Sequence, residues 1–161
     1  DMDRYVESLN DMVEQSRPFS ETGNVIVDSL LNIKLKAANH RLGIDPVLNL
    51  AIPSSLSIEN HDLCIILGNL LDNAIEALEQ CRNGYLGISM KVDAGMLFLQ
   101  IVNSYTGSLK KQGERFLTSK AASQEHGIGL NNVKKIVEMY HGEMHFKTED
   151  DLFRAEILLY L

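Results

Sequence analysis

The spacing of apolar residues along the chain alternates between helical and strand-like patterns. Near the start of the chain, apolar residues recur at steps of three and four positions, at Met2, Tyr5, Leu9 and Met12. This heptad seam predicts a helix that ends before Pro18, because the residue preceding a proline is driven out of the helical region. Two interpretations stay open: a helix packed on its own domain, or residues 1–17 as the C-terminal stub of a longer dimerisation helix.

Longer helices and short strands follow this first helix. Asn24 is a candidate N-cap and Gly43 a stop signal for a second helix, and a third helix is predicted at 60–80. Strands are predicted at 46–52, 84–92, 96–103, 144–148 and 153–161, with a last helix at 130–140 closed by His141-Gly142. This order predicts an α+β fold in which one mixed sheet is covered on one face by helices.

The helix at 60–80 combines a core stripe with a polar face. Its apolar stripe consists of Leu63, Leu67, Leu70, Leu71, Ala74 and Leu78. Its polar residues are Asn69, Asp72, Asn73 and Glu76, whose spacings of three, one and three place them on one helical face. Amides and carboxylates beside core positions cost stability unless something pairs with them, and Mg²⁺ bridged to phosphate oxygens would do so. A solvated helix face is the alternative.

A second polar region precedes the last helix. Gly127 and Gly129 flank one residue directly before that helix, which lets backbone N–H groups approach an anion, although a simple turn is the alternative. The segment from Gly107 to Gly127 has no clear period and carries a net charge of +2, four cations against two carboxylates, which leaves −9 for the rest of a chain whose net charge is −7. Its length predicts a lid, and its charge suits a polyphosphate chelated to a metal.

Composition narrows the function classes. A chain of 161 residues, 45% of them apolar, predicts one globular domain with an ordinary core. The acidic balance argues against a nucleic-acid partner, because phosphate contacts need clustered Lys and Arg. No apolar run approaches the ~20 residues of a membrane helix, so a soluble domain is expected.

Two segments resemble the ATPase superfamily of gyrase, a heat-shock chaperone, histidine kinases and MutL. Residues 69–77 resemble its N box, and residues 116–120 with 126–130 resemble its F box and second glycine box. The likeness spans roughly residues 22–161 and is strongest to sensor histidine kinases of the peptide-pheromone receptor group. It implies a Bergerat-type two-layer sandwich with a mostly antiparallel sheet, a catalytic domain at 18–161, and a flexible ATP lid at about 107–127.

The resemblance also implies roles for individual residues. Asn73 would be the Mg²⁺ ligand, Asn69 a contact to phosphates or metal, and both would be catalytic. Asn103 falls where most relatives have the Asp that binds the adenine amino group. The implied nucleotide-binding set is Asn69, Asp72, Asn73, Glu76, Asn103, Gly107, Lys120, His126, Gly127, Ile128, Gly129 and Leu130, and Phe116 accompanies Lys120 in the lid.

Departures from the family pattern bear on the reaction. Asn103 keeps an acceptor oxygen without the charge, Glu125 replaces a glycine, and Glu76 stands where kinases often have a basic residue. Relatives that hydrolyse ATP have a Glu base at the first N-box position, whereas Asn69 is no base. The sequence therefore predicts transfer of the γ-phosphoryl group to a histidine on a dimerisation helix absent from this chain. A regulatory nucleotide-binding module and a gyrase-like ATPase are the alternatives.

One histidine of this chain has a sequence context like that of a phosphoryl acceptor, and the resemblance also implies partners. His61-Asp62 mimics an acceptor box but is interpreted as a helix cap. ATP and Mg²⁺ are the expected cofactors. The expected partners are the histidine-bearing dimerisation domain of the same kinase, in a homodimer of the full-length protein, and a response regulator. The resemblance further implies a cytoplasmic domain of a membrane-bound bacterial receptor kinase that functions in quorum sensing, with membrane contact only through that receptor.

Overall fold

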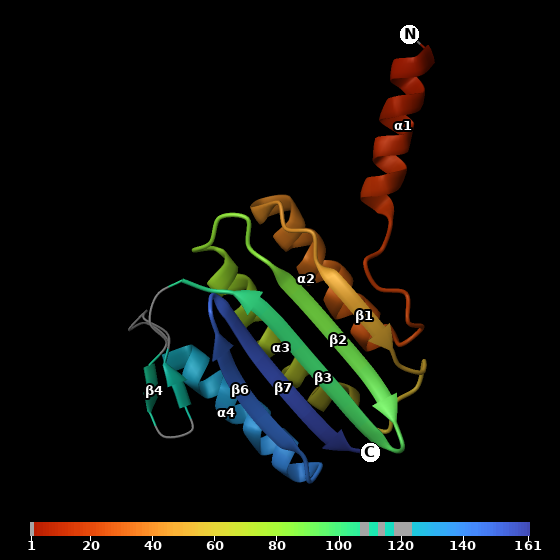
Figure 1. Ribbon diagram of the computed structural model, residues 1–161. Coiled ribbons are helices and arrows are strands. Elements are labelled where there is room, and N and C mark those ends of the chain that lie inside the picture. The colour runs from red at the N-terminus through yellow and green to blue at the C-terminus, as the bar shows by residue number, and fades with distance from the viewer. Residues whose placement is uncertain (1, 107–109, 113–114, 118–123) are drawn as a thin grey trace.

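A five-stranded sheet forms one layer of the domain in the computed structural model, which describes residues 2–106, 110–112, 115–117 and 124–161. Its strands are β1 Val47–Ala51, β2 Leu86–Asp93, β3 Met96–Ser104, β6 Glu143–Glu149 and β7 Leu152–Tyr160. They are ordered β1-β2-β3-β7-β6 (Figure 1). β1 and β2 are parallel and the other neighbours are antiparallel. The predicted mixed, mostly antiparallel sheet is confirmed.

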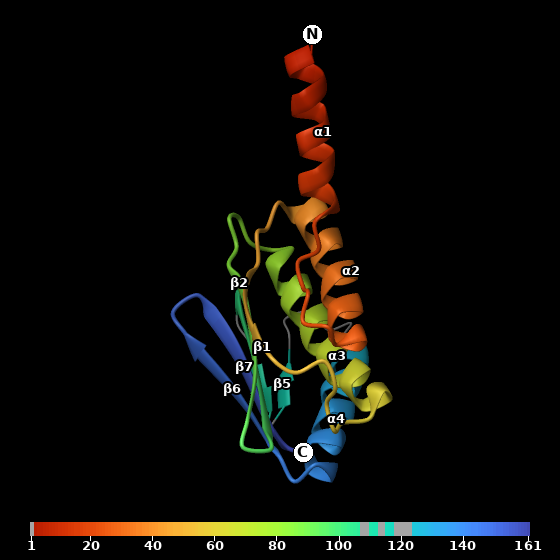
Figure 2. The same cartoon turned by 90° about the vertical axis from the view of Figure 1, so that its right-hand side faces the viewer.

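Three helices form the second layer. They are α2 Val25–Leu42, α3 Asn60–Leu78 and α4 Gln124–Met139. All three lie on the same face of the sheet, as Figure 2 shows, so the α+β prediction is confirmed. None of the helices in the described part of the chain has both the length and the hydropathy to cross a membrane.

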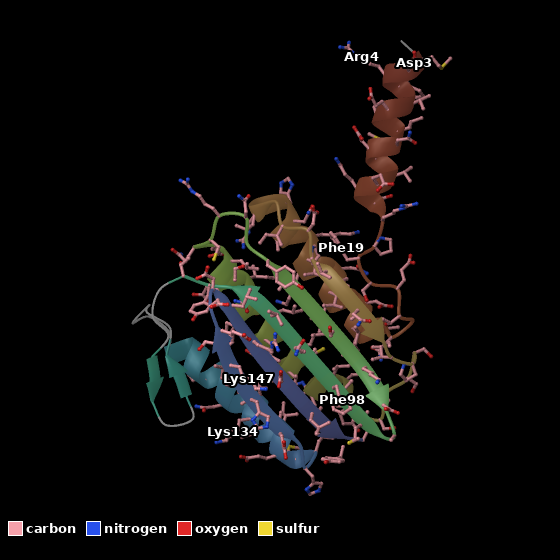
Figure 3. The ribbon with its side chains drawn as sticks, in the orientation of Figure 1. Asp3, Arg4, Phe19, Phe98, Lys134 and Lys147 are labelled. Atoms are coloured by element: carbon pink, nitrogen blue, oxygen red, sulfur yellow. The ribbon has the colours of Figure 1, made fainter. Side chains whose placement is uncertain are left out.

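The core lies between the two layers. Along β3, Leu97, Leu99 and Ile101 are buried against the helices, while Phe98 points to the uncovered face (Figure 3). This alternation follows from the two-residue period of a strand. All six residues of the stripe predicted for α3 are buried, and Leu67 is fully so.

The segment predicted as an irregular lid contains regular structure. Strands β4 Lys110–Gln112 and β5 Arg115–Leu117 pair antiparallel with each other. Helix α4 begins at Gln124, six residues before the predicted start, so Gly127 and Gly129 lie inside it. The prediction that both glycines precede the helix is wrong. The helix starts early because Gln124 and Glu125 are good helix formers and no stop signal separates residues 124–130 from the rest of α4.

The first helix, α1 Met2–Ser16, stands apart from the two layers. None of its residues is buried, and Tyr5 is 62% exposed. Figure 3 places Asp3 and Arg4 at its tip, far from the sheet. The alternative that this helix packs on its own domain is therefore wrong for this structure.

The linker after α1 is held to α2 by the amide of Asn32, which pairs with the backbone of Ser20, and by the carboxylate of Asp28. Asp28 accepts hydrogen bonds from Ser20 Oγ at 2.6 Å, from the backbone N–H and hydroxyl of Thr22 at 2.9 and 2.7 Å, and from Gly23 N–H at 2.9 Å. Burial alone would raise the pKa of Asp28, but these hydrogen bonds outweigh it, so the pKa lies below its ordinary value.

Asp28→Asn should destabilise the domain by about 2 kcal/mol at pH 7, because an amide cannot accept all of these hydrogen bonds. The lowered pKa stabilises the fold above the pKa of the unfolded chain. That contribution disappears as the pH falls through the folded-state value, so the difference between variant and wild type should shrink below about pH 4. Urea unfolding across pH measures it. Asp11→Asn, at an exposed carboxylate on α1, is the control, and a difference independent of pH would contradict the assignment.

Local signals fix several element ends as predicted. Asn24 caps α2 by accepting a hydrogen bond from Val27 N–H at 3.1 Å, and Gly43 ends it at φ +65°. Helix α4 ends differently, because His141 takes the left-handed conformation at φ +54° and Gly142 N–H closes onto Val137 O at 2.9 Å. The glycine there follows the left-handed residue instead of occupying its place.

Candidate functional site

A pocket opens between α3 and the helix-covered face of the sheet. Its lining comprises Leu70, Asn73, Ala74, Ala77, Ile101, Asn103, Tyr105, Leu130, Phe146, Phe153 and Ala155. Phe146 and Phe153 stack with ring centroids 5.7 Å apart. Most of the wall is apolar, with two amide side chains from separate elements. This combination is typical of sites for small molecules that carry a flat apolar group and a few polar atoms.

Asn103 is the buried polar group of this pocket. It lies near the end of β3 and is 3% exposed. Its Nδ2 donates to Ser104 O at 3.0 Å. One N–H of the amide is used in this bond, and the amide oxygen can accept a hydrogen bond from a ligand. The backbone N–H of Tyr105, in the same wall, donates to Asp151 O at 2.9 Å, which fixes the chain after the strand.

Asn73 is the second amide of the pocket, on the opposite wall. It lies in the C-terminal half of α3 and is half-buried. Asn73 and Asn103 are thirty positions apart in the sequence, and the packing of α3 on β3 brings both to one pocket. An amide oxygen here is a ligand type that Mg²⁺ accepts.

The other polar residues of the α3 face have different neighbours. Asp72 accepts from Lys34 Nζ of α2 at 2.5 Å, and its side chain is 60% exposed. Asn69 Nδ2 donates to Ile65 O at 2.7 Å, while a Cβ at Gly129 would lie 2.6 Å from Asn69 Oδ1. Glu76 is half-buried. Among the described residues, Asn73 alone of these four lines the pocket.

The structure thus separates a set that the sequence placed on one face. The four side chains span about 100° of the helix, which is wide enough for one edge to meet α2 and the other to meet the pocket. Asn69 lies where α3 approaches α4 closely, and a side chain at position 129 of α4 would collide with its amide oxygen. The nucleotide contact of Asp72 stays a prediction, and in this structure its carboxylate pairs with Lys34.

Several of the remaining predicted residues belong to α4. Leu130 lines the pocket and Ile128 is 57% exposed. His126 and Gly127 belong to the first turn of α4, and Phe116 belongs to β5. Gly107 and Lys120 lie outside the described residues.

Eight lining residues are not predicted as site residues from the sequence. They are Leu70, Ala74, Ala77, Ile101, Tyr105, Phe146, Phe153 and Ala155. Phe146 and Phe153 occupy alternate, inward-facing positions of β6 and β7, which signal a core but not a pocket. Only the pairing of these strands beside β3 shows that their rings border the same space as Asn103.

Comparison with known proteins gives consistent results. Residues 58–160 match the family described as GHKL domain. A Halalkalibacterium halodurans protein named "Probable C4-dicarboxylate sensor kinase" is 26% identical over 97 residues, 57% of this chain and 18% of that protein. The chain thus spans less than a fifth of the length of this curated relative.

Solved structures share the fold. Mycobacterial sensor histidine kinase MprB has a TM-score of 0.63 at 22% identity, over 83% of this chain and 94% of that chain. The nucleotide-free catalytic domain of histidine kinase ThkA has a TM-score of 0.66 at 18% identity, over 85% and 92%. Full-length ShkA in complex with AMPPNP has a TM-score of 0.62 at 15% identity, over 89% and 30%. The chain belongs to the GHKL domain family and has the fold of histidine kinase catalytic domains.

Proposed function

We propose that this chain is the ATP-binding catalytic domain of a sensor histidine kinase. It transfers the γ-phosphoryl group of ATP to a histidine on a dimerisation helix outside this chain. The observation that carries the proposal is the convergence of Asn73 and Asn103 on one largely apolar pocket in a GHKL domain. The sensor-kinase relative supports the same reading.

The pocket residues suit the two ends of a nucleotide. Adenine is flat and apolar on both faces, so it fits between the apolar residues of α3 and the sheet, and its amino group can donate to the oxygen of Asn103. Asn73, on the opposite wall, would face the phosphates. We assign the adenine contact to Asn103 and the phosphate side to Asn73.

Asn73 also fits a role as Mg²⁺ ligand. Mg²⁺ takes only one or two protein ligands when phosphates and water complete its octahedron, and a single amide oxygen meets that need. The described residues hold no cluster of three or more His, Cys, Asp or Glu side chains placed for a metal. When bound, Mg²⁺ would neutralise charge on the transferring phosphoryl group.

The residue at position 69 favours transfer over hydrolysis. An attacking water needs a base, and an amide cannot take its proton. The Nδ2 group of Asn69 is moreover engaged by Ile65 O, which holds the side chain against α4. We therefore expect slow hydrolysis without an acceptor histidine.

Helix α1 supplies the proposed link to the rest of the kinase. Its exposed stripe of Met2, Tyr5, Leu9 and Met12 has the spacing of a coiled-coil seam. We assign residues 1–17 to the end of a dimerisation helix and 18–161 to the catalytic domain. The parent protein would be a homodimeric receptor kinase at the membrane, with this domain in the cytoplasm and a response regulator as its phosphoryl acceptor.

A phosphotransfer assay tests the proposal. The chain is incubated with γ-labelled Mg-ATP and a second polypeptide that carries the histidine-bearing helix of the parent kinase. Acid-labile, base-stable label on that polypeptide is expected. Nucleotide binding without label transfer would indicate a regulatory module, and rapid release of free phosphate over many turnovers would indicate a gyrase-like ATPase.

Asn103→Ala should weaken ATP binding about tenfold, because the adenine amino group loses its acceptor inside a dry pocket. GTP serves as the control ligand, since it has a carbonyl oxygen where ATP has the amino group, and its weak binding should be unaffected. Competition titrations of ATP against GTP measure the ratio. An equal loss of affinity for both nucleotides would show that Asn103 does not contact the adenine amino group.

A further inference from the structure

The N-terminus of α3 is capped by Tyr140, the residue that follows the end of α4. Glu59 occupies the N-cap position without a side-chain cap of its own. Its backbone N–H donates to the hydroxyl of Tyr140 at 3.1 Å, and that hydroxyl donates to Asp62 Oδ2 at 2.7 Å. In an ordinary capping box the carboxylate at the third helical position would accept from the N-cap N–H directly. Here the tyrosine hydroxyl stands between the two groups.

Tyr140 also connects α4 to the sheet. Its carbonyl accepts from Tyr160 N–H of β7 at 3.3 Å, and its half-buried ring packs against the core. The residue therefore joins α3, the end of α4 and β7. Asp62 of α3 accepts from its hydroxyl, and Glu59 is the acidic residue at the N-cap.

Both helices also contribute residues to the pocket, among them Asn73 from α3 and Leu130 from α4. From Asp62 to Asn73 the distance along α3 is about 16 Å, and from Tyr140 back to Leu130 along α4 it is about 15 Å, at 1.5 Å per residue. The buried contacts between them, from residues such as Val133 and Val137, are apolar and have no directional preference. Near the pocket the fit is tight, because position 129 of α4 has no room beyond a hydrogen beside Asn69.

We propose that Tyr140 is a positioning residue whose hydroxyl sets the register of α4 on α3, so that Leu130 and Asn73 face each other across the nucleotide pocket. Apolar packing tolerates small sliding of one helix on another, whereas the two hydrogen bonds of the hydroxyl define one arrangement. This inference rests on the proposed function, because it concerns nucleotide binding at the same pocket.

Tyr140→Phe removes only the hydroxyl oxygen and tests the proposal. The Kd for Mg-ATP in calorimetric titration should rise about fivefold, because a smaller fraction of molecules holds the binding-competent register. Hydrogen exchange in the first turn of α3, at the N–H of Leu63 among others, should accelerate without any nucleotide. Tyr160→Phe, at a tyrosine that is 50% exposed, is the matched control and should bind like wild type.

Variants of Asp62 separate positioning from a general loss of stability. Asp62→Asn keeps an acceptor for the hydroxyl and should bind Mg-ATP within about twofold of wild type. Asp62→Ala should resemble Tyr140→Phe, and the double variant should be about as weak as Tyr140→Phe alone, because both changes break one network. Asp28→Asn, which weakens the fold at the distant linker, should leave the Kd unchanged.

Two results would overturn the proposal. If Tyr140→Phe lowers thermal stability but binds Mg-ATP as wild type does, the hydroxyl is structural only. If its effect on the Kd adds fully to that of Asp62→Ala, the two groups do not act together. Failure of the wild type to bind Mg-ATP at millimolar concentration would instead reject the proposed function, and the positioning role would fall with it.

Discussion

Asn73→Ala should reduce the affinity for Mg-ATP by about 100-fold or more, because it removes the amide oxygen that we propose as the protein's ligand to Mg²⁺. Phosphotransfer to the acceptor helix should fall at least as far. The side chain is half-buried at the pocket wall, so the fold itself should be little affected. Isothermal titration with Mg-ATP and circular dichroism measure the two properties.

Two further variants make this result specific. Asn73→Asp retains an oxygen ligand and should bind more tightly than Asn73→Ala. Asn49→Ala removes an equivalent amide from an exposed position of β1 and should behave like wild type. If Asn73→Ala binds Mg-ATP as tightly as wild type, the metal assignment is wrong.

Gly142→Ala should destabilise the domain by about 3 kcal/mol, because a Cβ at this position must displace backbone. That atom would lie 2.1 Å from the carbonyl oxygen of Leu158 and 3.0 Å from Leu159 Cδ2. The carbonyl belongs to β7, which pairs with β3 and β6 and cannot move alone. Urea unfolding measures the lower free energy of unfolding, and the m-value should stay the same as in wild type.

Two other positions separate this clash from simple backbone strain. Gly43 ends α2 at φ +65° with nothing within 4 Å of an added Cβ, so Gly43→Ala should cost only about 1 kcal/mol. His141 is itself left-handed at φ +54°, so His141→Gly should stabilise by roughly 0.5–1 kcal/mol. Equal costs for Gly142→Ala and Gly43→Ala would refute the close approach.

Much of the fold could be predicted from the sequence because its signals are local. Three features depend only on residues a few positions apart. They are the apolar stripe of α3, the cap of α2 at Asn24, and the Ala94-Gly95 turn, in which both φ angles are positive. The predicted start of α4 at residue 130 is wrong, because Gly127 and Gly129 are typical of a turn while the backbone there continues as helix.

The candidate site was predictable only in part. The family resemblance points to Asn73 and Asn103, and the structure brings both to one pocket. Helical spacing places Asn69 and Asp72 on the same face as Asn73, yet Asp72 pairs with Lys34 and Asn69 packs beside Gly129. Helical spacing gives the angle of a side chain around its own axis, but not which neighbour lies at that angle.

The sequence predicts most of the elements, their order, the buried stripe of α3 and the family, because each follows from local periodicity, caps or a contiguous motif. The exceptions are β4, β5 and the start of α4. Only the packed structure shows that α1 buries none of its residues, that Gly142 meets a β7 carbonyl, and that Tyr140 completes the cap of α3. These last contacts join residues separated by 16 to 81 positions in the chain. No local pattern encodes such pairs, because they arise only when whole elements pack against one another.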